Sequence, residues 1–268
     1  MCEVFILKKP LSIVITALSA VLLCVWLGGF LYAVQTNLNV QADESKNTSQ
    51  DTGKKSQAVN NEKDLKVVAV GDSLTRGMGD ETGKGYIGYL TDEMKAKSKK
   101  PVIVQNLGIS GQKSDSLLAQ VKTYSVTRQL KEADYILITI GGNDLFQGGQ
   151  TLVDFQPAAV KSIQQKYLHN LEAILSHVRS SNSGAVIFLV GLYNPFIELE
   201  NGKDTSQVVR EWNYKSAEAA AKQIKTVYVP TFDLFELKVN DYLYTDRFHP
   251  NSKGYRLIAE RVAALLTW

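Results

Sequence analysis

A serine, a histidine and an aspartate in this chain of 268 residues have the types and spacing of a nucleophile, a base and a group that orients the base. Ser73 follows an apolar run that ends at Val70, where a strand would give way to a loop. Asp246 and His249 lie three residues apart, so one turn can present the carboxylate to the imidazole. A serine hydroxyl becomes a nucleophile when a base accepts its proton and a third group holds that base. These residues therefore predict a serine hydrolase.

The other two histidines are poorer candidates for the base. His169 and His177 fall in one long amphipathic stretch, with no other candidate catalytic residue nearby in the sequence. We expect both to have structural or surface roles. The pair Asp246 and His249 also has an alternative role, because a helix is expected to begin near Ser252 and the pair could help to cap it. The spacing alone leaves both interpretations of the pair open.

Four short blocks of sequence resemble the ordered blocks of the SGNH, or GDSL, hydrolase family. The blocks are Gly71-Asp72-Ser73-Leu74, Gly108, Gly141-x-Asn143-Asp144 and Asp246-x-x-His249-Pro250. A single Gly-Asp-Ser would carry little weight, but four blocks in the family order are specific. The resemblance covers roughly Lys66 to Trp268 and implies a carboxylic ester hydrolase of the GDSL esterase and lipase type.

The resemblance implies a role for each matching residue. Ser73 is the expected nucleophile, His249 the general base and then acid, and Asp246 the residue that orients the imidazole. The implied oxyanion hole consists of the backbone N–H groups of Ser73 and Gly108 and the side chain of Asn143. Each such fixed donor can stabilise a transition state by about 3–4 kcal/mol. No step of this chemistry requires a cofactor.

Two aspartates beside these residues are expected to be structural. Asp72 and Asp144 should hold their loops through hydrogen bonds to backbone groups. Neither has another acid or a histidine nearby in the sequence, so no metal site is expected.

Strand-like and helix-like segments alternate from Asp64 to the end of the chain, which predicts one three-layer α/β/α domain. Short runs rich in β-branched residues suit strands of a parallel sheet that is buried on both faces. These runs are Leu65–Val70, Val102–Gln105, Tyr135–Ile140, Ala185–Val190 and Thr226–Val229. Pro157–Ser180 and Ser252–Leu266 have the spacing of amphipathic helices. The family resemblance further implies a flavodoxin-like five-stranded sheet with strand order 2-1-3-4-5.

The composition of the first 63 residues predicts a membrane anchor and a linker, which precede the predicted domain at 64–268. Leu11 to Val34 is almost entirely apolar, and as a helix of about 36 Å it would span a bilayer. The preceding lysines favour a cytoplasmic terminus at 1–10, which would place the hydrolase outside the membrane. Polar residues at 35–63 predict a flexible linker. A cleaved signal peptide, which would give a secreted protein, is the alternative.

Composition excludes several other classes of function. Both cysteines, Cys2 and Cys24, precede the predicted domain, which therefore has no disulfide, cysteine-based zinc site or cysteine nucleophile. A net charge of +3 is too small to indicate a nucleic-acid partner. The glycine-rich segment at 77–85 does not match the phosphate-binding pattern of nucleotide-binding proteins, because Met78 and Gly85 replace required residues.

The substrate is less well defined by the sequence. Membrane attachment outside the cytoplasm favours lipid-like esters, as in lysophospholipases. Four residues could line an acyl site, although their side chains could equally well only pack the loops: Leu192, Tyr193, Phe196 and Phe146. The alternatives are an O-acetyl esterase or an acyltransferase of envelope carbohydrate, and a non-catalytic module that binds wall polymers or lipids.

Overall fold

The computed structural model describes residues 19, 22–23, 26–28, 64–147 and 157–266. The chain divides into the units Met1–Asn60 and Asn61–Trp268. The described residues of the first unit have helical backbone and are exposed. The predicted terminus at 1–10, the linker at 35–63 and most of the predicted span at 11–34 lie outside the described residues. In the part of the chain that the structure does describe, no helix is both long and apolar enough to cross a membrane.

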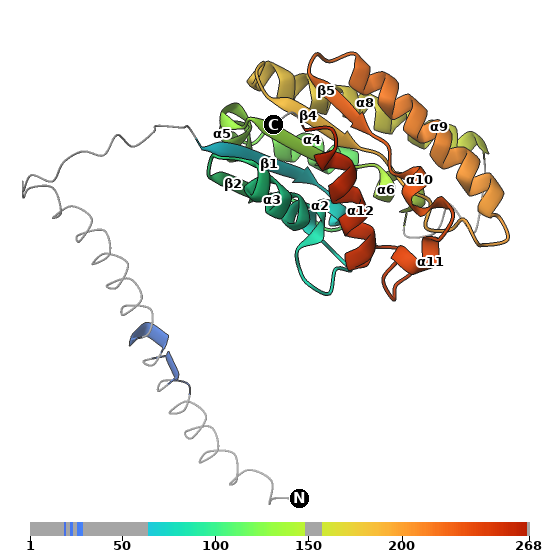
Figure 1. Cartoon of the computed structure of the whole chain (residues 1–268), viewed down its shortest axis with the longest axis horizontal. Helices are drawn as coiled ribbons and strands as arrows, with labels where there is room; N and C mark the ends of the chain where they lie inside the picture. The colour runs from blue at the N-terminus through green and yellow to red at the C-terminus, as the bar shows by residue number, and fades with distance from the viewer. Residues whose placement is uncertain (1–18, 20–21, 24–25, 29–63, 148–156, 267–268) are drawn as a thin grey trace, which may run out of the picture. The chain divides into compact units, whose positions relative to one another are not determined.

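Five parallel strands form one sheet in the second unit, with the order β2-β1-β3-β4-β5 (Figure 1). The strands are β1 (Leu65–Gly71), β2 (Val102–Asn106), β3 (Tyr135–Thr139), β4 (Val186–Val190) and β5 (Thr226–Val229). Every neighbouring pair is parallel. This confirms the predicted fold and strand order, and the predicted runs differ from the strands by no more than one residue at either end.

The helices cover both faces of the sheet and make two separate cores. Their bounds are α2 (Ser73–Arg76), α3 (Gly85–Lys97), α4 (Ser114–Val121), α5 (Tyr124–Glu132), α6 (Gly142–Phe146), α8 (Pro157–Ser181), α9 (Gly202–Ala221), α10 (Phe232–Glu236), α11 (Val239–Tyr242) and α12 (Ser252–Ala263). Side chains of α4, α5, α8 and α9 share one core with Val68 and Val70 of β1. Those of α3 and α12 share the other core with Val67 and Ala69. Successive residues of a strand point to opposite faces, so β1 contributes to both cores.

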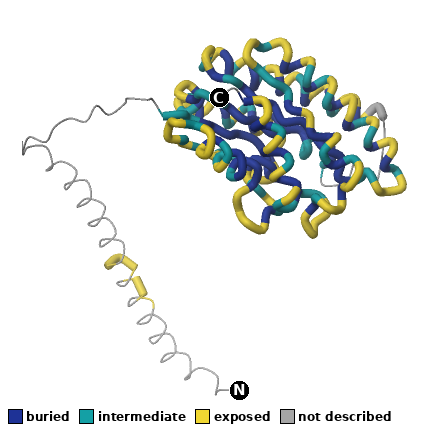
Figure 2. The backbone as a smooth tube through the Cα atoms, in the orientation of Figure 1, coloured by how far each residue is buried: buried dark blue, intermediate teal, exposed yellow. Residues whose placement is uncertain are grey.

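Burial follows this three-layer arrangement. The inner strands β1, β3 and β4 are buried over most of their length, whereas the edge strand β2 is largely exposed or half-buried (Figure 2). The centre of the sheet, which includes β1 and β3, is therefore well protected from water. The loops that follow the carboxyl ends of these two strands carry the predicted serine and asparagine blocks.

A close contact between the ends of β1 and β3 requires glycine at position 71. Gly71 has φ of +135°, and a Cβ atom there would lie 2.0 Å from the carbonyl oxygen of Thr139. The backbone N–H of Asp72 donates to that same carbonyl over 3.1 Å. Glycine allows both the backbone angle and the close approach. The chain consequently leaves β1 against the end of β3, at the point in the strand order where α/β sheets bind ligands.

Candidate active site

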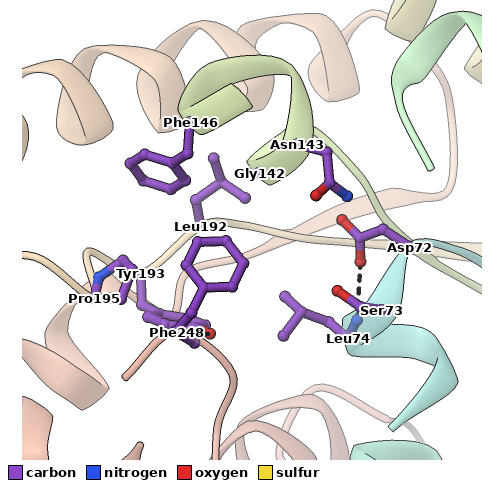
Figure 3. Close-up of a pocket in the computed structure, with 10 residues that line it drawn as sticks. All are labelled: Asp72, Ser73, Leu74, Gly142, Asn143, Phe146, Leu192, Tyr193, Pro195 and Phe248. Atoms are coloured by element: carbon purple, nitrogen blue, oxygen red, sulfur yellow. Dashed lines mark hydrogen bonds between the residues drawn. The ribbon is translucent and has the colours of Figure 1, made fainter. Parts of the chain in front are cut away.

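The backbone around Ser73 is held by the aspartate that precedes it. Asp72 is the N-cap of α2, and its Oδ1 accepts the N–H of Leu74 over 3.0 Å (Figure 3). The hydroxyl of Thr139 donates to the same oxygen over 2.7 Å. Burial raises the pKa of Asp72, although these two hydrogen bonds favour the ionised carboxylate. Asp72 therefore binds a side chain of β3 as well as the backbone expected from the sequence.

Ser73, His249 and Asp246 form a continuous series of hydrogen bonds. The Nε2 atom of His249 lies 2.8 Å from the Oγ of Ser73. The Nδ1 atom of the same ring lies 2.7 Å from Oδ2 of Asp246. The structure therefore brings the predicted nucleophile, base and orienting residue together, although Ser73 and His249 are separated by 176 residues. This is the geometry that activates a serine hydroxyl.

The loop that carries His249 is organised by Asp246 itself. Oδ1 of Asp246 accepts the backbone N–H groups of Phe248 and His249, over 2.9 and 3.0 Å. Arg247, between Asp246 and Phe248, has a φ of +54°. The cap of α12 is instead Asn251, whose side chain accepts two backbone N–H groups of that helix. The carboxylate of Asp246 is thus directed to the histidine and its loop, and it does not cap the helix.

These contacts set the ionisation of Asp246. Partial burial raises its pKa, but the hydrogen bonds from the His249 ring and from the N–H groups of Phe248 and His249 outweigh it. The net result is a pKa below the usual value of 3.8. The ionised form of Asp246 is therefore favoured, and it can stabilise the imidazolium formed during catalysis.

Two of the three predicted oxyanion donors lie in one pocket. The backbone N–H of Ser73 has no acceptor in the described part of the chain. Asn143, at the start of α6, lines the same pocket as Ser73. Its Nδ2 donates one hydrogen to the carbonyl of Gln112 over 3.0 Å, which fixes the amide and leaves a second hydrogen for a ligand.

The structure does not support Gly108 as the third donor. The N–H of Gly108 already donates to Oδ1 of Asn106 over 3.0 Å. A Cβ atom at this position would lie 2.6 Å from the backbone nitrogen of Arg76, so glycine serves here to let two loops approach each other. Its N–H is committed to its own loop, and the assignment made from the sequence is corrected on this ground.

Gly111, three residues later in the same loop, is a better placed candidate that sequence reasoning missed. Its N–H has no acceptor among the described residues, and its φ is +77°. The next residue, Gln112, is the one whose carbonyl binds Asn143. A Cβ atom at position 111 would meet no atom within 4 Å, and Gly111 is exposed. The signal available in the sequence was a second glycine beyond Gly108.

A small pocket opens beside Ser73. Its apolar wall consists of Leu74, Phe146, Leu192, Tyr193, Pro195 and Phe248 (Figure 3). Of the four predicted substrate residues, Phe146, Leu192 and Tyr193 therefore line the pocket. Phe196 lies behind this wall, with its ring 5.1 Å from that of Phe146 and 5.9 Å from that of Phe248.

Phe248 was not predicted as a pocket residue, yet it joins the pocket to the catalytic loop. Its ring makes an edge contact with that of His249, with 5.1 Å between centroids. Its carbonyl accepts the hydroxyl of Tyr193 over 2.6 Å. One residue therefore contacts both the predicted base and the wall of the pocket.

The remaining candidates have structural surroundings. His177 lies within hydrogen-bond distance of Thr127 and of the carbonyl of Val121, and His169 is exposed on α8. In the segment at 77–85, Asp80 accepts the N–H groups of Thr82 and Gly85, so the loop closes on its own side chain. Within the described ranges, no group of three or more His, Cys, Asp or Glu residues could hold a metal ion.

The chain is similar to proteins of a known family. Residues 69–257 match the model of the GDSL-like Lipase/Acylhydrolase family. The chain belongs to this family. It is 36% identical over 220 residues to the protein YpmR of Bacillus subtilis (strain 168), which covers 80% of this chain and 86% of that protein.

Two further GDSL-family relatives carry lipase names. The spore germination lipase LipC of Bacillus licheniformis is 29% identical over 212 residues, or 75% of this chain and 95% of that protein. The crystal structure of the lipase Lip_vut3 from a goat rumen metagenome has a TM-score of 0.68 and 25% identity, covering 75% and 96% of the two chains. With the family match, these similarities identify the chain as a carboxylic ester hydrolase.

The lowered pKa of Asp246 leads to a prediction for Asp246→Asn. Because the folded-state pKa lies below the unfolded one, the ionised group stabilises the fold above its usual pKa, and this is lost as pH falls through the lowered value. The difference in unfolding free energy between wild type and Asp246→Asn should therefore be constant above about pH 6 and shrink below about pH 4. Urea unfolding at a series of pH values measures it.

The control for this experiment is Asp241→Asn, which removes an exposed carboxylate from the neighbouring helix α11. It should show no comparable dependence on pH. A stability difference for Asp246→Asn that grows on acidification would contradict the assigned direction of the pKa.

Proposed function

We propose that the protein is a serine esterase that hydrolyses lipid-like esters outside the membrane, through Ser73, His249 and Asp246. The observation that carries the proposal is the continuous hydrogen-bond series of these three side chains beside an apolar pocket. A lysophospholipase-like substrate, with one acyl chain and a polar alcohol, suits this combination of groups.

In the proposed mechanism the Oγ of Ser73 attacks the ester carbonyl while Nε2 of His249 accepts its proton. The developing oxyanion receives hydrogen bonds from the N–H of Ser73, from the free amide hydrogen of Asn143 and from the N–H of Gly111. The imidazolium, stabilised by Asp246, then donates its proton to the leaving alcohol. A water molecule then attacks the acyl-enzyme while His249 accepts a proton from it. The imidazolium donates this proton to the Oγ of Ser73 as the bond to the acyl group breaks, which releases the carboxylic acid and restores the serine.

The character of the pocket supports an apolar acyl group. Apolar side chains surround the space next to Ser73, and its polar residues are limited to the predicted catalytic and oxyanion groups with Asp72. An alkyl chain would lose contact with water there, which stabilises binding by about 0.8 kcal/mol for each buried CH₂. An O-acetyl esterase or an acyltransferase of envelope carbohydrate would use the same chemistry with a different acyl or acceptor group.

The proposal includes attachment to the outer side of the membrane. It is supported by the apolar segment from Leu11 to Val34 and by the lysines that precede it. A domain tethered in this way would meet esters of the cell envelope.

Replacement of the proposed nucleophile gives the first test. Ser73→Ala and His249→Ala should each lower kcat for p-nitrophenyl butyrate by several orders of magnitude, because the nucleophile and base act as a unit. His169→Ala, which removes an exposed histidine, is the matched control and should keep wild-type kcat. Full activity in Ser73→Ala would contradict the proposed mechanism.

Chain-length preference tests the proposed substrate class. We expect kcat/KM for p-nitrophenyl esters from acetate to palmitate to peak at medium or long chains, because longer alkyl chains can contact the apolar side chains beside Ser73. Phe248→Ala should flatten this dependence, while Phe188→Ala, which removes a buried ring of strand β4, should only destabilise the protein. Activity confined to the acetate ester would favour the O-acetyl esterase instead.

Cell fractionation tests the proposed location. The full chain should remain with membranes after an alkaline carbonate wash, and a chain of residues 64–268 made with a cleavable export signal should be released. Recovery of the full-length gene product in the external medium, shortened at its N-terminus, would indicate a cleaved signal peptide.

A further inference from the structure

Asp144 is a carboxylate next to the proposed oxyanion asparagine, and the proposed mechanism gives it no role. Its oxygens accept the hydroxyl of Ser114 over 2.6 Å and the backbone N–H of Ser114 over 3.0 and 3.2 Å. Ser114 is the first residue of α4, whereas Asp144 lies in α6. The side chain therefore joins two elements that follow different strands.

The Ser114 hydroxyl also has a second partner. It accepts the Nδ2 of Asn170, on α8, over 3.0 Å. Both Ser114 and Asn170 are buried. Burial raises the pKa of Asp144, and the hydrogen bonds that the hydroxyl and the backbone N–H of Ser114 donate to it lower that pKa. A carboxylate is costly to withdraw from water unless its hydrogen bonds compensate, so this arrangement favours one position of the Ser114 end of the loop.

The segment held in this way is the loop at 107–113, between β2 and α4. At its other end, the N–H groups of Leu107 and Ile109 donate to carbonyls of β1 over 2.8 Å each. In the second half of this loop, the carbonyl of Gln112 accepts a hydrogen bond from the side chain of Asn143. Two consecutive residues of α6 thus hold the loop just after Gly111, whose N–H has no acceptor in the described chain.

We propose that Asp144 is a positioning residue, which fixes the loop at 107–113 so that the amide of Asn143 and the N–H of Gly111 converge on one oxyanion. The inference rests on the proposed function and adds to it the element that sets the donor geometry. A donor is effective only when it is already aimed at the developing charge, and misplacement by about 1 Å can cost about 100-fold in rate.

The test compares Asp144→Ala and Asp144→Asn with wild type for one ester substrate. Asp144→Ala should lower kcat by about 100-fold with little change in KM, because the donors act on the transition state. Asp144→Asn should recover much of this loss, since its carbonyl oxygen still accepts from Ser114. Ser114→Ala, which keeps the backbone bond, should lower kcat less than Asp144→Ala does.

The matched control is Asp134→Ala. Asp134 also joins two elements by a carboxylate-to-backbone bond, accepting the N–H of Lys66 over 2.8 Å, but it lies at the amino ends of the strands. It should lower the melting temperature and leave kcat unchanged. A decrease in kcat for Asp134→Ala equal to that for Asp144→Ala would overturn the proposal, because general destabilisation would then explain both.

A double-mutant cycle with Asn143→Ala separates positioning from an independent effect. Asp144→Ala should cost far less in the Asn143→Ala background than in wild type, because the donor it helps to position is already missing. Equal losses in both backgrounds would overturn the proposal. If Asp144→Ala does not fold, the same cycle is run with Ser114→Ala. Wild-type activity in Ser73→Ala would instead refute the proposed function itself.

Discussion

The contact between the ends of β1 and β3 is the constraint on which the site depends. Asp72 binds Thr139 twice, through its backbone N–H to the carbonyl and through its carboxylate to the hydroxyl. The Thr139 hydroxyl is also 2.8 Å from that of Thr75, which lies 3.2 Å from the hydroxyl of Tyr86 on α3. A buried polar chain thus connects the loop of the proposed nucleophile to the sheet and to a helix. Such a network permits few alternative positions for Ser73.

A similar arrangement supports the proposed oxyanion asparagine. Asp72 precedes Ser73 in the chain, and Asp144 follows Asn143. Each aspartate accepts one hydroxyl and one backbone N–H, and in each case the hydroxyl belongs to a different element. The groups proposed to contact substrate are consequently supported by carboxylates that the substrate need not touch. Hydrogen bonds of this kind combine strength with defined direction.

The sequence was sufficient to predict the parts of the fold that have a clear period or a local signature. The strands were found because their runs of apolar residues are short and continuous, and the resemblance to the family supplied their order. Asp246 and His249 could be paired because their spacing in one turn is local. Gly108 was misassigned because nothing in the sequence shows that the side chain of Asn106 takes its N–H. Phe248 was missed as a pocket residue because its ring contacts join three segments that are far apart in the sequence.

Tyr193 connects the wall of the pocket to the loop that carries His249. Its hydroxyl holds the carbonyl of Phe248, and its ring stacks on Phe235 with 4.2 Å between centroids. A change in Tyr193 or Phe248 therefore alters the pocket and the support of the histidine loop together. Phe146 borders the same space, and Phe196 packs against its ring from behind; neither takes part in the backbone hydrogen bonds of that loop. Over evolution, new acyl preferences in this lineage would arise more readily at Phe146 and Phe196, where selection can reshape the cavity while the reaction rate is preserved.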